Sequence, residues 1–211
     1  MHEAFHPRAP ERAAPLAVAT GAAEASSATL PAPIVAAAYA GPRSGLLRTG
    51  LRNPLPAGVL SGYVGDTGLD IASKPRTVYA IAAAKLDYAE AGHTRWIGKG
   101  DTPFCVRLEL DTPIAITRAG KPRKVTHVYY AHLTSVLRPQ TEGHRPRAHV
   151  EAGEPIGVSG TANGLPHLHL GLLLDGQVEQ DDWTYILREH EVRDVLGGYA
   201  TGKQLPKDVD G

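Results

Sequence analysis

From Gly58 onward the chain is a series of short β-type runs separated by glycine and proline. Closely spaced runs of this kind are typical of antiparallel sheets, because each turn returns the chain beside the strand it has just left. We therefore expect a mainly β domain, an antiparallel β-sheet sandwich. The expected strands are Val78–Ala83, Thr94–Ile97, Cys105–Leu110, Val125–Ala131, Pro155–Ser159 and His167–Leu174.

The composition changes at both ends of this β-rich region. Residues 1–57 are rich in alanine and proline and predict a flexible leader, without the basic start and continuous apolar run of a clear secretory signal. Residues 58–180 form the expected domain. In residues 181–211, charged and aliphatic residues at helical spacing from Trp183 to Leu196 predict a C-terminal helix that ends at Gly197, followed by a polar tail.

The overall composition excludes several classes of partner. Lysine plus arginine equals aspartate plus glutamate at 22 each, which gives no electrostatic argument for nucleic acid or anionic lipid as a partner. No run approaches the roughly 20 apolar residues that span a bilayer, so we expect no integral membrane segment. The single cysteine, Cys105, cannot form an internal disulfide and is expected at a buried strand position.

The sequence Pro166-His167-Leu168-His169-Leu170 places two histidines one residue apart on an expected strand. Alternate side chains of a strand share a face, so both imidazoles can reach one point. Such a pair is half of a metal site or of a proton-transfer site. Taken alone, the pair is better explained as two solvent-facing histidines on an edge strand.

Two further groups of polar residues precede this pair. Asp66 and Asp70 flank Gly68, which permits a bend that brings both carboxylates toward one centre, although a polar turn would explain them as well. Tyr130 and His132 follow the period of two in Tyr129-Tyr130-Ala131-His132-Leu133, so we expect them on one strand face.

In this order the pieces resemble the LytM and lysostaphin-type zinc endopeptidases, peptidase family twenty-three. The resemblance covers about residues 62–176, and its combination of motifs is specific although each motif alone is weak. It implies a LytM-type β domain that hydrolyses peptide bonds of peptidoglycan. The matching segments are Gly68–Ala72, Val78–Ala80, Tyr130–Leu133, Gly157–Gly160 and Pro166–His169.

The resemblance also implies roles for individual residues. It makes Asp70 and His169 ligands of one zinc ion, and His132 and His167 the histidines that activate the attacking water and stabilise the oxyanion. A zinc ion with an open position lowers the pKa of its bound water and polarises the scissile carbonyl. A cell-wall peptide as partner implies a periplasmic or extracellular location, whereas the oligomeric state is not predicted.

The chain departs from the family at the first zinc ligand, where Asp66 replaces a histidine. With Asp66 as ligand, two negative charges face the metal, which weakens it as a Lewis acid and relaxes the preference for zinc over other divalent ions. The alternative is a catalytically degenerate LytM-like domain that binds cell-wall peptide or regulates a partner hydrolase. His93 is a further possible donor, although nothing fixes its distance from the site.

Other polar and aromatic residues rank lower as site candidates. His127 lies an odd number of residues from His132, so we expect it on the opposite face, at the surface. His144 and His149 lie in an expected solvated loop. Tyr88 and Trp96 either line the peptide-binding groove of the expected site or belong to the hydrophobic core.

Overall fold

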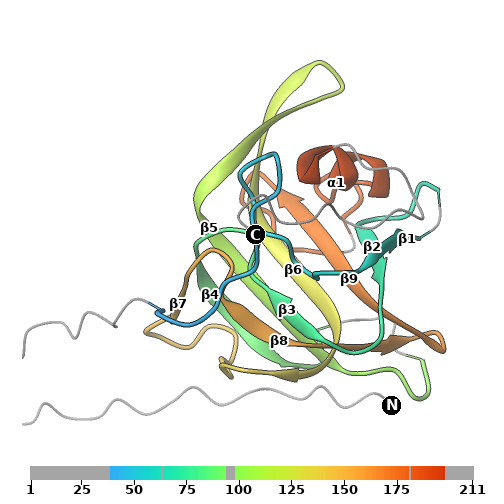
Figure 1. Ribbon diagram of the computed structural model, residues 1–211. Coiled ribbons are helices and arrows are strands. Elements are labelled where there is room, and N and C mark those ends of the chain that lie inside the picture. Colours follow the sequence, from blue (N-terminus) through green and yellow to red (C-terminus); the bar gives the residue numbers. More distant parts are fainter. Residues whose placement is uncertain (1–38, 63, 94–97, 181, 198–211) are drawn as a thin grey trace, which may run out of the picture. The chain divides into compact units, whose positions relative to one another are not determined.

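The structure is a computed structural model that describes residues 39–62, 64–93, 98–180 and 182–197. Its strands form one nine-stranded antiparallel sheet, in the order β1-β2-β9-β8-β6-β5-β4-β7, with β3 paired to β8 (Figure 1). The expected antiparallel β architecture is therefore confirmed. The strands are β1 (Val59–Ser61), β2 (Leu69–Ala72), β3 (Thr77–Tyr79), β4 (Ala84–Ala91), β5 (Phe104–Arg118), β6 (Lys121–Val136), β7 (His149–Val150), β8 (Pro155–Ala162) and β9 (Leu165–Leu174).

The expected strands differ from the observed ones mainly in length. The runs at 105–110 and 125–131 are parts of β5 and β6, which together form a long hairpin. The run at 78–83 is shorter than expected, because the backbone of Ala80 bonds to the loop residues Gly153 and Glu154 instead of to a strand. The run at 94–97 lies outside the described residues.

Strand β6 changes its partner where it reaches the site. It pairs with β9 as far as Ala131 and with β8 from Leu133 onward. Against β5, Ala131 and His132 lie opposite the single residue Cys105, which is a β-bulge. His132 has a φ of 60°, in the left-handed region that few non-glycine residues adopt. The bulge gives His132 an orientation that regular strand alternation would not.

The two faces of β9 contact different parts of the protein. Leu168, Leu170, Leu172 and Leu174 enter the main hydrophobic core. The residues that alternate with these leucines, including His167 and His169, face the other side of the strand, as regular strand alternation requires. A smaller buried cluster lies on that side and forms the base of the candidate site. It consists of Tyr88, Cys105, Tyr129, Ala131, Leu173 and Ile186, and it confirms the buried position expected for Cys105.

The C-terminal helix α1 is shorter than expected and covers Glu189–Leu196, ending at Gly197 as predicted. The preceding segment is extended: Leu174 N donates to Tyr185 O, and Leu187 N donates to Leu172 O. Strand β2 pairs only with the first half of β9, at residues 167–170. On the same edge, the backbone groups of the second half of β9 bond to the segment before α1 instead. A helix beginning at Trp183 is therefore wrong.

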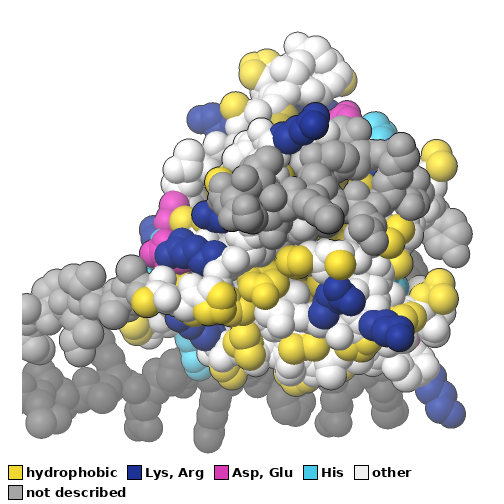
Figure 2. All heavy atoms as spheres, viewed as in Figure 1, with side chains coloured by type: hydrophobic (Ala, Val, Ile, Leu, Met, Phe, Trp, Pro, Cys, Tyr) yellow, Lys and Arg dark blue, Asp and Glu magenta, His cyan; other side chains and the backbone are white. Residues whose placement is uncertain are grey.

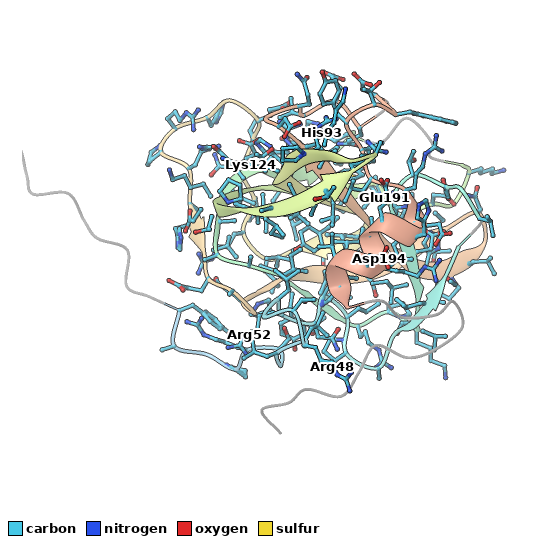
Figure 3. All side chains as sticks on the ribbon, turned by 90° about the horizontal axis from the view of Figure 1, so that it is seen from above. Arg48, Arg52, His93, Lys124, Glu191 and Asp194 are labelled. Atoms are coloured by element: carbon cyan, nitrogen blue, oxygen red, sulfur yellow. The ribbon has the colours of Figure 1, made fainter. Side chains whose placement is uncertain are left out.

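Helix α1 is held by charge pairing as well as by buried apolar residues. The two carboxylate oxygens of Glu191 accept hydrogen bonds from Arg118 Nε and Nη2, at 2.8 and 3.0 Å. Val192 and Leu196 are buried. Figure 3 shows Glu191 and Asp194 on this helix, beneath the β5–β6 hairpin. The pairing ties the helix to the end of β5.

The surface carries no concentrated basic patch on the face in Figure 2, where described lysines and arginines are scattered among apolar and polar side chains. In the part of the chain that the structure describes, no helix combines the length and the apolar character needed to cross a membrane.

Candidate functional site

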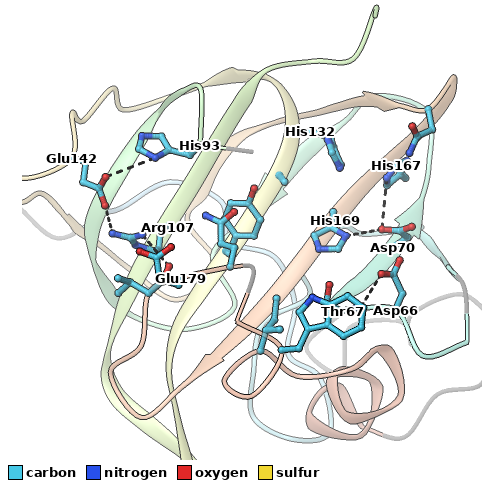
Figure 4. A pocket seen from close by; sticks show the side chains of 17 residues that line it. Asp66, Thr67, Asp70, His93, Arg107, His132, Glu142, His167, His169 and Glu179 are labelled. Carbon is cyan, nitrogen blue, oxygen red and sulfur yellow. Dashed lines mark hydrogen bonds and ion pairs between the residues drawn. The ribbon is translucent and has the colours of Figure 1, made fainter. Parts of the chain in front are cut away.

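A pocket of about 520 Å³ opens beside the second face of β9 (Figure 4). One end is lined by the five residues to which the sequence analysis gave site roles, and the other by side chains of which it had named only His93. The first group is Asp66, Asp70, His132, His167 and His169; the second includes His93, Arg107, Glu142, Glu179 and Gln180. The fold thus brings all five predicted site residues to one cavity.

The pairing of β2 with β9 sets the centre of the site. Asp70 lies directly opposite His169, and Ala72 opposite His167. Opposite residues of antiparallel strands project to the same face, so the Asp70 carboxylate meets the His169 ring, with Oδ1 2.9 Å from Nδ1. His167 and His169 line the same pocket, as their spacing predicts.

The Asp70 carboxylate is held in its charged form. Burial alone would raise its pKa, but the hydrogen bond from His169 and the nearby histidines outweigh burial and lower the pKa of Asp70. A charged carboxylate can only accept, so Nδ1 of His169 carries the proton of this hydrogen bond. Asp70 Oδ1 and His169 Nδ1 are therefore two donor atoms side by side for a cation that displaces that proton.

The His167 ring is oriented by the backbone. Its Nδ1 lies 2.9 Å from Leu165 O, and a carbonyl only accepts, so Nδ1 carries the proton. In the neutral ring Nε2 then has a free lone pair. This atom lies 3.6 Å from Asp70 Oδ1. His167 thus presents a proton acceptor beside the Asp70–His169 pair.

His132 reaches the site through the bulge in β6, and its ring is 5.1 Å from that of His167 between centroids. It is only 8% exposed, and its Nδ1 has no hydrogen-bond partner among the described residues. Burial and the two neighbouring histidines lower the pKa of His132 to about 4. His132 is therefore neutral near pH 7, and one of its ring nitrogens carries a proton that can be donated in a hydrogen bond.

The expectation that Tyr130 shares a face with His132 is wrong. Tyr130 lies in the main core, where its hydroxyl accepts a hydrogen bond from Ile81 N at 2.9 Å. Tyr129 and Ala131 line the pocket instead. The inserted residue at the bulge shifts the alternation, so that His132 follows Ala131 onto the pocket face.

Asp66 lies on the pocket wall, and the first residue of α1 and the segment before this helix hold the backbone around it. Glu189 N donates to Asp66 O at 2.9 Å, and Gly68 N donates to Leu187 O at 2.8 Å. The Asp66 side chain accepts a hydrogen bond from Thr67 N through Oδ1, at 2.8 Å. Figure 4 shows Asp66 beside Asp70. The C-terminal segment therefore positions the loop that carries Asp66.

Gly68 allows His169 to sit where it does. It has a φ of 75°, and a Cβ there would lie 2.6 Å from His169 Nε2 and 2.9 Å from Leu170 O. Both the backbone conformation and the contact exclude a side chain. The bend anticipated at Gly68 is present, and it also makes room for the His169 ring.

The donor set fits a divalent metal in part. Asp70 Oδ1 and His169 Nδ1 are close enough to bind one ion together. Across the described residues, however, no group of three or more His, Cys, Asp or Glu side chains is arranged to hold a metal. Asp66 is the neighbouring carboxylate on the pocket wall, and its Oδ1 accepts a hydrogen bond from Thr67 N.

Most of the secondary candidates lie elsewhere. The expectation of a surface position for His127 is wrong: it is buried beside Asp87, and burial lowers its pKa. His144 and His149 are exposed, as expected. His93 lines the far end of the pocket, where its Nε2 lies 2.8 Å from Glu90 Oε1.

The aromatic candidates separate in the same way. Tyr88 belongs to the buried cluster at the base of the pocket, and its hydroxyl accepts a hydrogen bond from Gln180 Nε2 at 2.6 Å. The His93 ring stacks on that of Tyr88, with 3.8 Å between ring centroids. Trp96 lies outside the described residues.

Sequence reasoning missed Arg107, Glu142, Glu179 and Trp183 as pocket residues. They come from β5 and from two loops, and only tertiary structure brings them together. One signal was available: Arg107 lies inside a strongly apolar strand, and a buried arginine requires charged partners.

Comparisons with known proteins give distant structural likenesses. No protein-family model matches the sequence, nor does any curated protein. The antimicrobial peptidase lysostaphin from Staphylococcus simulans is 17% identical with a TM-score of 0.46, over 73% of this chain and 56% of that protein. Its catalytic domain, solved separately, gives 18% and 0.40, over 63% and 90% of the two chains. A SpoIIIAH–SpoIIQ complex gives 15% and 0.41, over 58% and 90%. Likenesses this distant leave the function to be argued from the site.

Proposed function

We propose that this chain is a metal-dependent endopeptidase of the LytM type that hydrolyses peptide bonds of peptidoglycan. The observation that carries the proposal is the pairing of Asp70 with His169 across β2 and β9, with His132 and His167 on the same pocket wall. These are the residues to which the motif resemblance assigns metal binding and proton transfer. The peptidoglycan substrate rests on that resemblance alone.

In this proposal Asp70 and His169 would hold one zinc ion. Asp66 would be the third ligand, after its carboxylate gives up the hydrogen bond from Thr67 N. When bound, zinc would polarise the scissile carbonyl and lower the pKa of a coordinated water. The proton between His169 Nδ1 and Asp70 must leave when a metal takes its place, so metal binding weakens as the pH falls.

The two remaining histidines have separate roles: His167 transfers the proton, and His132 stabilises the oxyanion. His167 Nε2 has a free lone pair, because Leu165 O fixes the proton on Nδ1. It can take the proton of the attacking water and return it to the leaving amine. His132 is neutral and buried, so it can donate a hydrogen bond to a developing oxyanion from whichever nitrogen carries its proton.

Replacing Asp66 with histidine tests the ligand set. The change restores a neutral donor at the family's first position and removes one negative charge, and we expect zinc affinity to rise about tenfold or more and hydrolysis to quicken. Calorimetric titration with zinc measures the affinity. Asp194→His, at an exposed position of α1, is the matched control and should leave the zinc affinity unchanged. An Asp66→His variant with unaltered zinc affinity would place Asp66 outside the metal site.

A second candidate is a non-hydrolytic domain that binds cell-wall peptide or regulates a partner hydrolase. The engagement of Asp66 with Thr67 N favours it, as does the lack of a preformed three-ligand group among the described residues. This candidate predicts peptide binding without zinc and without cleavage. Metal content and hydrolysis measured on the same preparation distinguish the two.

A further inference from the structure

The far end of the pocket, around Arg107, Glu142 and Glu179, has an unbalanced charge. We propose that it binds a primary ammonium group of the bound peptide, such as a lysine-type side chain, so that the pocket selects cationic over neutral peptides. The inference rests on the proposed function only in taking this pocket as the peptide site, and it applies whether or not the peptide is cleaved.

The charge of the pocket is negative with the histidines neutral. Its lining carries the carboxylates of Asp66, Asp70, Glu142 and Glu179, against the single guanidinium of Arg107. A divalent metal held by Asp66 and Asp70 would neutralise that end. The two glutamates then still outnumber Arg107 at the other end, so the imbalance does not depend on the metal.

Arg107 is already engaged with groups of the protein. It is only 7% exposed, and its Nε donates to Asp87 Oδ2 at 2.9 Å. Its Nη1 donates to Val178 O at 3.3 Å, and its Nη2 donates to Glu142. Asp87 also pairs with Arg147, which pairs in turn with Glu109. Because three carboxylates, those of Asp87, Glu109 and Glu142, surround these two guanidinium groups, little positive charge of Arg107 remains to repel a cation.

Glu179 supplies the available negative charge. It is exposed on the loop after β9 and lines the pocket, and its carboxylate has no hydrogen-bond or ion-pair partner among the described residues. Arg107 holds the same loop through Val178 O, and Gln180 holds it through the Tyr88 hydroxyl. The unpaired carboxylate is therefore carried on a segment anchored on both sides.

The pocket also has features of a ligand site beyond its acidic residues. At the opposite end from Glu179, His132 lines the pocket as a ring more than nine-tenths buried, whose Nδ1 has no partner among the described residues; Figure 4 shows this ring directed toward His167 and His169. Val178, Trp183 and Ile186 add apolar surface to the pocket wall. An ammonium group on an aliphatic stem matches a pocket wall that combines apolar surface with carboxylates.

Binding of three blocked pentapeptides tests the inference. They consist of alanine and glycine around a central lysine, Nε-acetyllysine or glutamate, and their Kd values are measured by NMR titration at about pH 8, where histidines are neutral. We expect the lysine peptide to bind about fivefold or more tighter than the acetyllysine peptide, and the glutamate peptide to bind weakest. Added salt should reduce the preference.

The variant Glu179→Gln should abolish the preference while leaving the fold intact, because the Glu179 carboxylate is exposed and forms no hydrogen bond or ion pair with another described residue. Asp194→Asn is the matched control: Figure 3 shows Asp194 on α1, well away from His93 at the pocket's far end, and the variant should keep the preference. Equal affinities for the lysine and acetyllysine peptides, or no binding of the lysine peptide, would overturn the inference. Cleavage without charge preference contradicts this inference alone, and charge preference without cleavage contradicts the endopeptidase proposal alone.

Discussion

Under the proposed endopeptidase function, the His169→Ala variant is expected to lose peptidoglycan hydrolysis by on the order of 10³-fold, equivalent to about 4 kcal/mol of transition-state stabilisation. His169 provides one of the two donor atoms that already meet at the centre of the site, and Asp70 alone cannot hold a metal there. Removing the ring should therefore abolish zinc binding together with activity. The rate at which new amino groups are released from peptidoglycan measures the loss.

His144→Ala is the matched control for this variant. His144 is also a histidine, but it is exposed in the loop after β6 and lies outside the pocket. Its replacement should change the rate less than about twofold, because isolated surface substitutions have small effects. A His169→Ala enzyme that retains most of its activity would remove His169 from the metal site.

The Gly68→Ala variant is expected to lose activity by on the order of 10²-fold and stability by about 2 kcal/mol. Gly68 has a φ of 75°, and its new Cβ would meet His169 Nε2 at 2.6 Å and Leu170 O at 2.9 Å. Displacing the close-packed backbone of β9 costs more free energy than rotating a side chain, so we expect the His169 ring to move away from Asp70. Hydrolysis rates and denaturant unfolding measure the two losses.

Gly65→Ala separates backbone strain from displacement of the ring. Gly65 has a φ of 83°, and a Cβ there would have no neighbour within 4 Å. This variant should lose about 1 kcal/mol of stability through strain and retain its activity. Equal activity in the two variants would show that the contact between Gly68 and His169 does not position the ring.

Strand periodicity and the order of the motifs together predicted the residues that line one end of the pocket. The periodicity placed His167 and His169 on one face, and the motif order singled out Asp66, Asp70 and His132. The periodicity failed at Tyr130, because an inserted residue in β6 has no signature in the sequence. A left-handed φ at His132 is uncommon for a side chain of that size. Bulges are set by the pairing of neighbouring strands, which becomes visible only in three dimensions.

The far end of the pocket and the segment before α1 lay beyond sequence reasoning for the same cause. Charged and aliphatic residues at helical spacing suggested a helix from Trp183, but open backbone groups on the second half of β9 draw Tyr185–Leu187 into an extended pairing. Arg107 and Glu142 are 35 residues apart and meet through a loop. Tertiary pairing overrides local pattern in both places.

Zinc-dependent cleavage of peptidoglycan by the full chain is the most direct test of the central claim. The protein is treated with a chelator, dialysed, and assayed for release of amino groups before and after addition of one equivalent of zinc. We expect no cleavage by the metal-free protein and recovery of activity with one zinc ion bound per chain. No bound zinc and no cleavage after zinc addition, in a protein that remains folded, would contradict the account.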